Sequence, residues 1–173
     1  PLMTSFNFDT SLYFVKDDYD LTATFGLNDT GNIQRRALWG EELREMSSKF
    51  LNLQLNTGDL FIQYNYVQND TSNNYNYWLQ SEMDIDSRQS HVQVGYDFSL
   101  PSFSTELSAG ADHRVIKFDT GGNVFGVNEN DDDYRTYGAS IQSKTKLSNN
   151  IDILFQGRYD HFSVLNEGAF SPK

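Results

Sequence analysis

The chain has 173 residues, no cysteine and a formal net charge of −11. The length suits one domain with a sizeable core. The lack of cysteine excludes disulfides and cysteine-ligated metal sites, and the acidic balance argues against a nucleic-acid surface, which needs a basic stripe. The sequence contains no run of about 18 apolar residues, so it predicts no transmembrane helix. Aromatic residues make up 14% of the chain and only three prolines occur, which favours β-strands.

Apolar and polar residues alternate in short segments along the chain, a pattern that predicts about eight antiparallel strands. In chain order they cover residues 8–15, 21–27, 51–55, 60–67, 92–98, 107–118, 137–145 and 151–162. In the last of these, Ile153 and Phe155 fall on one face while Asp152 and Arg158 fall on the other. The fold class predicted is therefore all-β.

The predicted connections alternate between short turns and long polar loops. The turns are residues 16–19, 57–59, 99–104 and 148–150, and the loops are residues 28–48, 68–88, 119–133 and a segment beginning at Ser163. Residues 36–46 could form a short amphipathic helix, but Gly40 interrupts it and we prefer a loop. Loops beyond about 12–15 residues are uncommon in compact domains, whereas outer-membrane barrels carry short periplasmic turns and long external loops. The pattern predicts the strands of an antiparallel up-and-down transmembrane β-barrel.

The two faces of the predicted strands differ in polarity. In a membrane barrel the apolar face meets lipid and the polar face lines the lumen. The residues expected to face the lumen include Lys144, Asp152, Gln156, Arg158 and Asp160. We expect the two cations to pair with acidic neighbours, Asp97 among them, and to stabilise the wall or meet a plug. Polarity alone does not decide which face is wet, so a soluble barrel with a dry centre around Leu53, Ile62, Val94 and Ile153 stays open.

Aromatic residues in the predicted loops are candidates for ligand contact. Planar rings beside hydrogen-bonding asparagine would suit siderophores, corrinoids or sugars. These residues are Trp39, Tyr75, Tyr77 and Trp78. The alternative is that they pack the loops against one another.

No pattern predicts catalysis, a metal site or a cofactor. Asp160 and His161 are adjacent in a strand and point to opposite faces, so they cannot form a dyad. His91 and His113 lack metal-ligand spacing. The acidic run at residues 129–133 lacks the glycine and distal glutamate of an EF-hand loop. We expect a protein that is not an enzyme.

The segment Gly157-Arg158-Tyr159-Asp160-His161-Phe162, followed by Phe170-Ser171-Pro172-Lys173, resembles the barrel of TonB-dependent outer-membrane receptors. Two further segments occur in the same order as in that family: a turn and strand at residues 57–64 and a strand at residues 137–147. The similarity consists of short motifs and spans nearly the whole chain. The resemblance implies a barrel of about 22 strands with a plugged lumen. It also implies active import of a scarce nutrient (siderophore-iron, cobalamin or glycan) across the bacterial outer membrane.

On this resemblance, residues 1–173 are an internal part of the barrel domain, without the plug domain. The chain departs from the family in lacking the TonB-contacting box and a terminal aromatic strand, and it has no signal peptide at Pro1. The partners implied are outer-membrane lipid, the plug and remaining strands, the TonB energising complex and a small-molecule ligand. Two alternatives stay open: a complete eight-stranded outer-membrane barrel of structural or adhesin type, and a soluble β-barrel or sandwich that binds a ligand.

Overall fold

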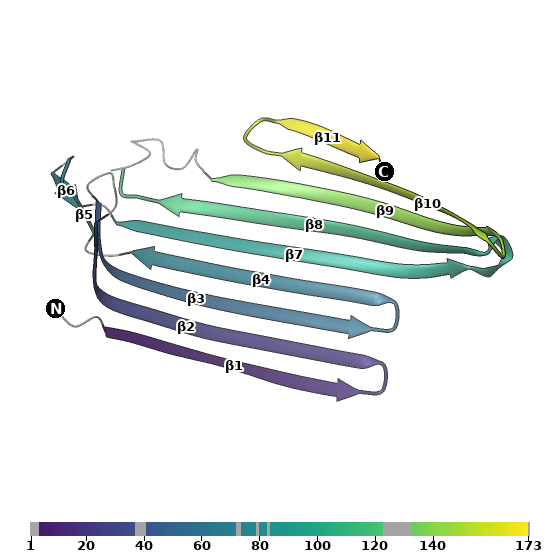
Figure 1. The fold of residues 1–173 in the computed structure, drawn as a ribbon, viewed down its shortest axis with the longest axis horizontal. Coiled ribbons are helices and arrows are strands. Elements are labelled where there is room, and N and C mark those ends of the chain that lie inside the picture. The colour runs from purple at the N-terminus through teal and green to yellow at the C-terminus, as the bar shows by residue number, and fades with distance from the viewer. Residues whose placement is uncertain are drawn as a thin grey trace.

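The computed structural model describes residues 4–36, 41–71, 74–78, 80–82, 84–122 and 133–172. In this part of the chain, nine strands form one antiparallel up-and-down sheet in chain order (Figure 1). They are β1 (Thr4–Lys16), β2 (Tyr19–Arg36), β3 (Glu41–Thr57), β4 (Leu60–Thr71), β7 (Ile85–Leu100), β8 (Thr105–Asp119), β9 (Tyr134–Ser148), β10 (Ile151–Phe162) and β11 (Glu167–Pro172). The two-residue strands β5 (Tyr75–Asn76) and β6 (Ser81–Glu82) pair with each other, and β5 also pairs with β3. No helix in the described ranges is long and apolar enough to cross a membrane.

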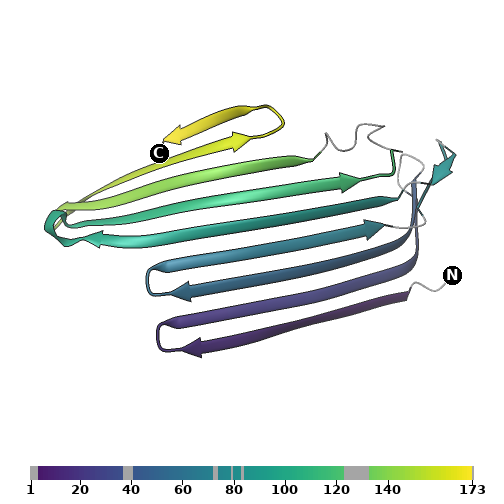
Figure 2. The same cartoon turned by 180° about the vertical axis from the view of Figure 1, so that it is seen from behind.

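The all-β fold and the antiparallel neighbour order confirm the prediction, but the number of strands and the closure of the sheet differ from it. The sheet has nine principal strands among the described residues rather than about eight, because β11 follows a turn at residues 163–166 where a loop was expected. The sheet is open, with β1 and β11 as its edges, and is not closed into a barrel. Figure 2 shows the same open edges from behind.

The predicted loop at residues 28–48 is wrong for its described residues, 28–36 and 41–48, which are strand. Strand β2 continues to Arg36, strand β3 begins at Glu41, and the two pair as far as Arg36 with Glu42. The helix alternative for residues 36–46 is wrong for the described residues from Glu41 onwards, which are strand. Backbone hydrogen bonds do not require alternating apolar side chains, so a ladder can extend through polar sequence where no buried face marks it.

The short turns confirm their prediction and lie together at one end of the sheet (Figure 1). Asp17 and Gly58 begin two-residue turns with positive φ angles of 52° and 53°. Glycine adopts this region without steric cost, and aspartate tolerates it better than most residues. The turn between β7 and β8 contains the 3₁₀ turn η1 (Pro101–Phe103). Lys146 donates its backbone N–H to the carbonyl oxygen of Ser104 at 2.9 Å.

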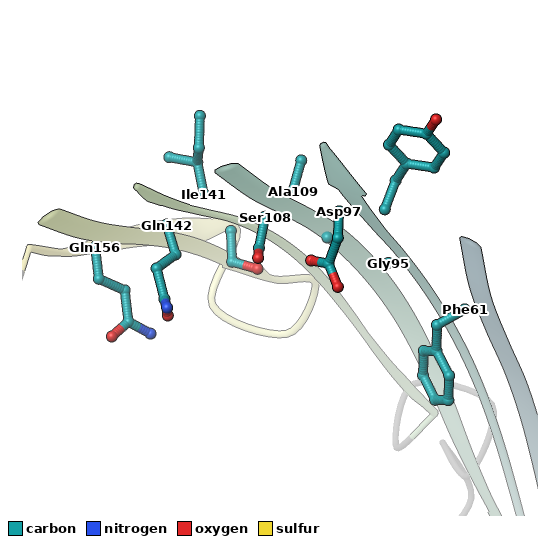
Figure 3. Close-up of a pocket in the computed structure, with 11 residues that line it drawn as sticks. Phe61, Gly95, Asp97, Ser108, Ala109, Ile141, Gln142 and Gln156 are labelled. Atoms are coloured by element: carbon teal, nitrogen blue, oxygen red, sulfur yellow. The ribbon is translucent and has the colours of Figure 1, made fainter. Parts of the chain in front are cut away.

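The sheet is a single curved layer with a polar and an apolar face. Figure 3 shows Ser108, Gln142 and Gln156 on the concave face and Ala109 and Ile141 on the convex face. Through the strand register, Leu53, Ile62, Val94 and Ile153 also belong to the convex face. Leu53, Val94 and Ile153 are 37%, 40% and 50% exposed. The described residues therefore do not gather these side chains into a dry centre.

Candidate functional site

The charged side chains of Arg158, Asp160 and Asp112 form a cluster that joins β10 to β8 on the concave face, and His91 of β7 lies beside it. Arg158 donates from Nε to Asp160 Oδ2 at 2.9 Å and from Nη2 to Asp160 Oδ1 at 2.6 Å. The same Nη2 donates to Asp112 Oδ1 at 2.9 Å. His91 Nε2 lies 3.6 Å from the other oxygen, Asp112 Oδ2. The bond from Arg158 to Asp112 links β10 to β8, which are separated by β9. Hydrogen bonds between ionised partners are stronger than those between neutral groups.

Gly138 makes the link from β10 to β8 possible. It lies on β9, between Asp160 and Asp112 in the same row of the sheet. A Cβ atom at this position would collide with both Arg158 Nη2 and the Asp112 carboxylate. The missing side chain leaves the space through which the guanidinium crosses β9.

Amide side chains continue the polar surface toward the N-terminal strands. Gln54, Gln63 and Gln93 are register partners on β3, β4 and β7 and lie in the row that leads to Asp112. One row away, Asn52 donates its side-chain N–H to Asn65. Such groups offer donors and acceptors to water or to a polar solute without adding charge.

A shallow hollow of about 340 Å³ lies on the sheet beside this cluster (Figure 3). Asp97, Ser108, Gln142 and Gln156 extend into the concave side of it, and Phe61 provides an aromatic ring at its margin. The hollow is open to the concave side, so it can hold water or a small polar group but does not enclose a drug-sized ligand.

The five predicted lumen residues all lie on the concave face by register. Arg158 and Asp160 belong to the charged cluster, whereas Lys144 and Asp152 form a separate pair with Nζ and Oδ2 3.8 Å apart. Gln156 lines the hollow. Asp160 and His161 point to opposite faces, and the His161 ring lies on the convex side near Tyr137.

Three of the four predicted loop aromatics, Tyr75, Tyr77 and Trp78, lie in or next to β5, at the end of the sheet opposite the short turns (Figure 1). Tyr75 and Tyr77 contact edge to face with ring centroids 5.0 Å apart. Arg44 lies 5.8 Å above the Tyr75 ring, and Trp78 is 73% exposed. Trp39 lies outside the described residues. Tyr75 therefore packs within the loop region, and Trp78 presents its ring to the surroundings.

The sequence did not predict that Asp112, His91 and Gly138 lie together with Arg158. Asp112 and Arg158 are 46 positions apart, and their contact depends on the register of three strands. Alternation within residues 137–145 indicates which face Gly138 shares with Lys144, but not which residues of other strands lie beside it. Among the described residues, no group of three or more histidine, aspartate or glutamate side chains is placed to hold a metal ion.

The convex face carries an apolar band, which the polar side chains of Ser143 and Thr145 interrupt on β9. On β7 it comprises Val92, Val94, Tyr96, Phe98 and Leu100. Its register partners on neighbouring strands include Leu53, Ile62, Leu107, Ala111 and Phe155. A row of rings borders the band, with His113 and Tyr137 stacked at 4.5 Å.

The fold and its surfaces thus define an antiparallel up-and-down sheet with one polar and one apolar face. A scan against protein-family models, a search of curated proteins and a search of solved structures gave no match.

Proposed function

We propose that this chain forms part of the wall of an outer-membrane β-barrel of the TonB-dependent receptor type, which imports a scarce nutrient. The main observation in favour of a membrane location is the exposed apolar band on the convex face. A soluble protein of this size buries its apolar strand faces against a second layer or inside a barrel. The receptor class and the nutrient rest on the resemblance of residues 157–173 and on the exposed ring of Trp78.

The dimensions of the band suit a bilayer. On β7 it runs from Val92 to Leu100, about nine residues, which matches the roughly 9–11 residues of a tilted transmembrane strand. On the same face of β7, the residues that come before Val92 in the sequence are Ser90, Arg88 and Asp86, so the apolar band ends in charged residues there. Aromatic residues at the border of an apolar band are typical of the headgroup level in barrels.

The polar concave face suits a water-filled or plugged lumen. Its charged cluster keeps the Arg158 and Asp112 side chains paired, which lowers the cost of placing charge beside a lipid-facing wall. Amide groups and the shallow hollow provide hydrogen-bonding positions for water, a plug or a passing polar solute.

Strand direction limits how such a wall can close. Nine antiparallel strands place β1 and β11 in the same direction, so these two edges cannot pair antiparallel with each other. An all-antiparallel barrel therefore needs an odd number of additional strands. A barrel of about 22 strands meets this condition.

The membrane placement can be tested with spin labels at consecutive positions of β7. The protein has no cysteine, so single-cysteine variants from Val92 to Phe98 can be labelled in reconstituted bilayers without background. We expect oxygen collisions to peak at Val92, Val94, Tyr96 and Phe98, and collisions with a water-soluble nickel reagent to peak at Gln93, Gly95 and Asp97. Equal exposure of both sets to the nickel reagent would overturn the membrane wall.

The receptor class needs a separate test. Deleting the gene should lower uptake of one nutrient from a panel of labelled siderophores, cobalamin and glycans, and a protonophore should abolish the same uptake in the parent strain. The gene should also encode an upstream plug domain and further downstream strands. Unchanged uptake of every nutrient would remove the receptor while leaving the membrane wall intact.

A further inference from the structure

A row of polar side chains crosses four strands on the concave face, along the hollow. The row, which we term the polar row, consists of the register partners Asp97 on β7, Ser108 on β8, Gln142 on β9 and Gln156 on β10 (Figure 3). Among the described residues, no protein hydrogen bond or ion pair holds the side chains of Asp97, Gln142 and Gln156. The polar row therefore presents its donors and acceptors to whatever fills the hollow.

The next row toward the loop end leaves space for such contact. Its members on β7, β8 and β9 are Gly95, Gly110 and Ser140, so little side chain stands above the backbone there. Phe61 is the register partner of Gly95 on β4, and Arg158 is the register partner of Ser140 on β10. The result is a groove beside the polar row, with an aromatic ring at one end and a guanidinium at the other.

We propose that this groove binds a neutral polyhydroxylated solute of the oligosaccharide class. The proposal rests on the receptor function proposed above and names its substrate class. A carboxylate accepts hydrogen bonds from hydroxyl groups, and each carboxamide both donates and accepts, so the polar row complements neighbouring hydroxyls of a sugar ring. The Phe61 ring supplies a flat apolar surface for the C–H face of such a ring.

The spacing of the polar row matches the repeat of an oligosaccharide. Neighbouring strands lie about 4.8 Å apart, so the row presents one side chain per strand over roughly 14 Å. A pyranose unit spans four bonds of about 1.5 Å from its anomeric carbon to the oxygen of the next linkage, hence roughly 5 Å. Successive sugar rings laid along the groove can therefore meet successive side chains of the row.

The charges around the groove disfavour an anionic solute. Arg158 already donates hydrogen bonds to two carboxylates, and Asp97 adds a third carboxylate in the polar row. A second hollow of about 300 Å³ toward the turns also includes Asp97 in its lining. Its other acidic residues are Asp59 and Glu106. Lys144, one row beyond Gln142, pairs with Asp152, so an anion meets repulsion that neutral hydroxyls do not.

Three trisaccharides that share their linkage and differ in charge test the assignment: cellotriose and its glucuronate and glucosamine counterparts. The full-length protein, in a detergent without a sugar headgroup, is titrated with each and followed by saturation-transfer NMR, since an open groove favours rapid exchange. We expect cellotriose to bind about fivefold or more tightly than the glucuronate trimer, the factor expected for one like charge about 4 Å away in water. Tighter binding of the glucosamine trimer would overturn the neutral assignment, and no binding of any trimer would overturn the site.

Variants test whether the binding occurs in the groove. Gln142→Leu and Gln156→Leu should each weaken cellotriose binding about three- to tenfold, as expected for the loss of one or two hydrogen bonds to neutral groups. The control Gln89→Leu makes the same change on the concave face of β7, further toward the loop end, and should leave the affinity unchanged. Asp97→Asn keeps the shape of the side chain and should raise the affinity for the glucuronate trimer about fivefold, which tests the groove even where a leucine variant folds poorly. Unchanged affinities in all three groove variants would overturn the site.

Uptake by cells separates this proposal from the receptor function. Cellotriose binding in the groove without energised cellotriose uptake would overturn the receptor and leave the groove as a saccharide site. Energised uptake of a siderophore or cobalamin, together with no trimer binding, would overturn the groove assignment alone.

Discussion

Arg158 on β10 reaches across β9 to donate a hydrogen bond to Asp112 on β8, with Nη2 and Oδ1 2.9 Å apart. The Asp112 side chain is only 13% exposed. The contact therefore supplies a cation to a carboxylate that water reaches poorly. It ties three strands of a sheet whose other cross-strand links are mostly between direct neighbours.

Replacing Arg158 by glutamine should lower the free energy of unfolding by about 1–2 kcal/mol, because Asp112 loses its cation while the exposed side of the cluster stays screened. The matched change Lys144→Gln should cost less than about 0.5 kcal/mol, since its 3.8 Å pair with Asp152 is half-exposed on both sides. Denaturant unfolding of both variants checks this. Equal midpoints would show that the cluster does not stabilise the sheet.

Adding a methyl group at Gly138 should also lower the free energy of unfolding, through a steric collision rather than the loss of a charge. Gly138→Ala places Cβ against the Arg158 guanidinium and the Asp112 carboxylate, so we expect a loss of about 1–3 kcal/mol. In the double variant Gly138→Ala/Arg158→Gln the losses should be less than additive, because one variant already breaks the contact. Full additivity in the unfolding midpoints would contradict this account.

Two glycines should respond to alanine in opposite directions. Gly58 has a φ of 53° and open space around its Cβ direction, so Gly58→Ala should cost about 1 kcal/mol through the backbone alone. Gly95 has an ordinary strand conformation, and an added Cβ would lie 3.7 Å from Phe61. Gly95→Ala should therefore be neutral or stabilise by about 0.5 kcal/mol. Thermal or denaturant unfolding gives both values, and the same sign for both would exclude the backbone explanation.

The two faces of β7 should tolerate charge differently. Val94→Lys places a cation in the apolar band and should cost about 2–4 kcal/mol of membrane insertion if this level lies near the bilayer centre. Gln93→Lys, the adjacent residue on the concave face, should change insertion by less than about 1 kcal/mol. The folded fraction in lipid vesicles measures both. Equal tolerance at the two positions would argue for water on both faces.

Trp78 and Tyr75 should separate ligand contact from loop packing. Trp78 is exposed, so Trp78→Ala should leave the unfolding midpoint within about 0.5 kcal/mol of the parent while reducing nutrient uptake. Tyr75→Ala removes the edge-to-face contact with Tyr77 and should cost about 1 kcal/mol of stability. Unchanged uptake in the Trp78 variant would remove it from the candidate ligand contacts.

Much of the sheet could be predicted because strand side chains alternate regardless of their neighbours. The alternation of apolar and polar residues around Val94 and Ile153 identified the strands β7 and β10. The turn residues Asp17 and Gly58 identified two of the turns at one end of the sheet. The extensions of β2 and β3 could not be predicted from alternation, because their polar residues pair through the backbone. Strand β11 was missed for a related reason: its six residues are all exposed and mark no buried face.

The sequence by itself determined which residues share a face, since that depends only on the two-residue period of a strand. Tertiary structure decided which face is concave, because curvature arises from twist summed over many strands. It also decided which side chains meet across the sheet, since register aligned Lys49 with Arg88 and Lys117 and brought Arg158 over Gly138 to Asp112. Those relations depend on the positions of several strands at once, and no local pattern contains them.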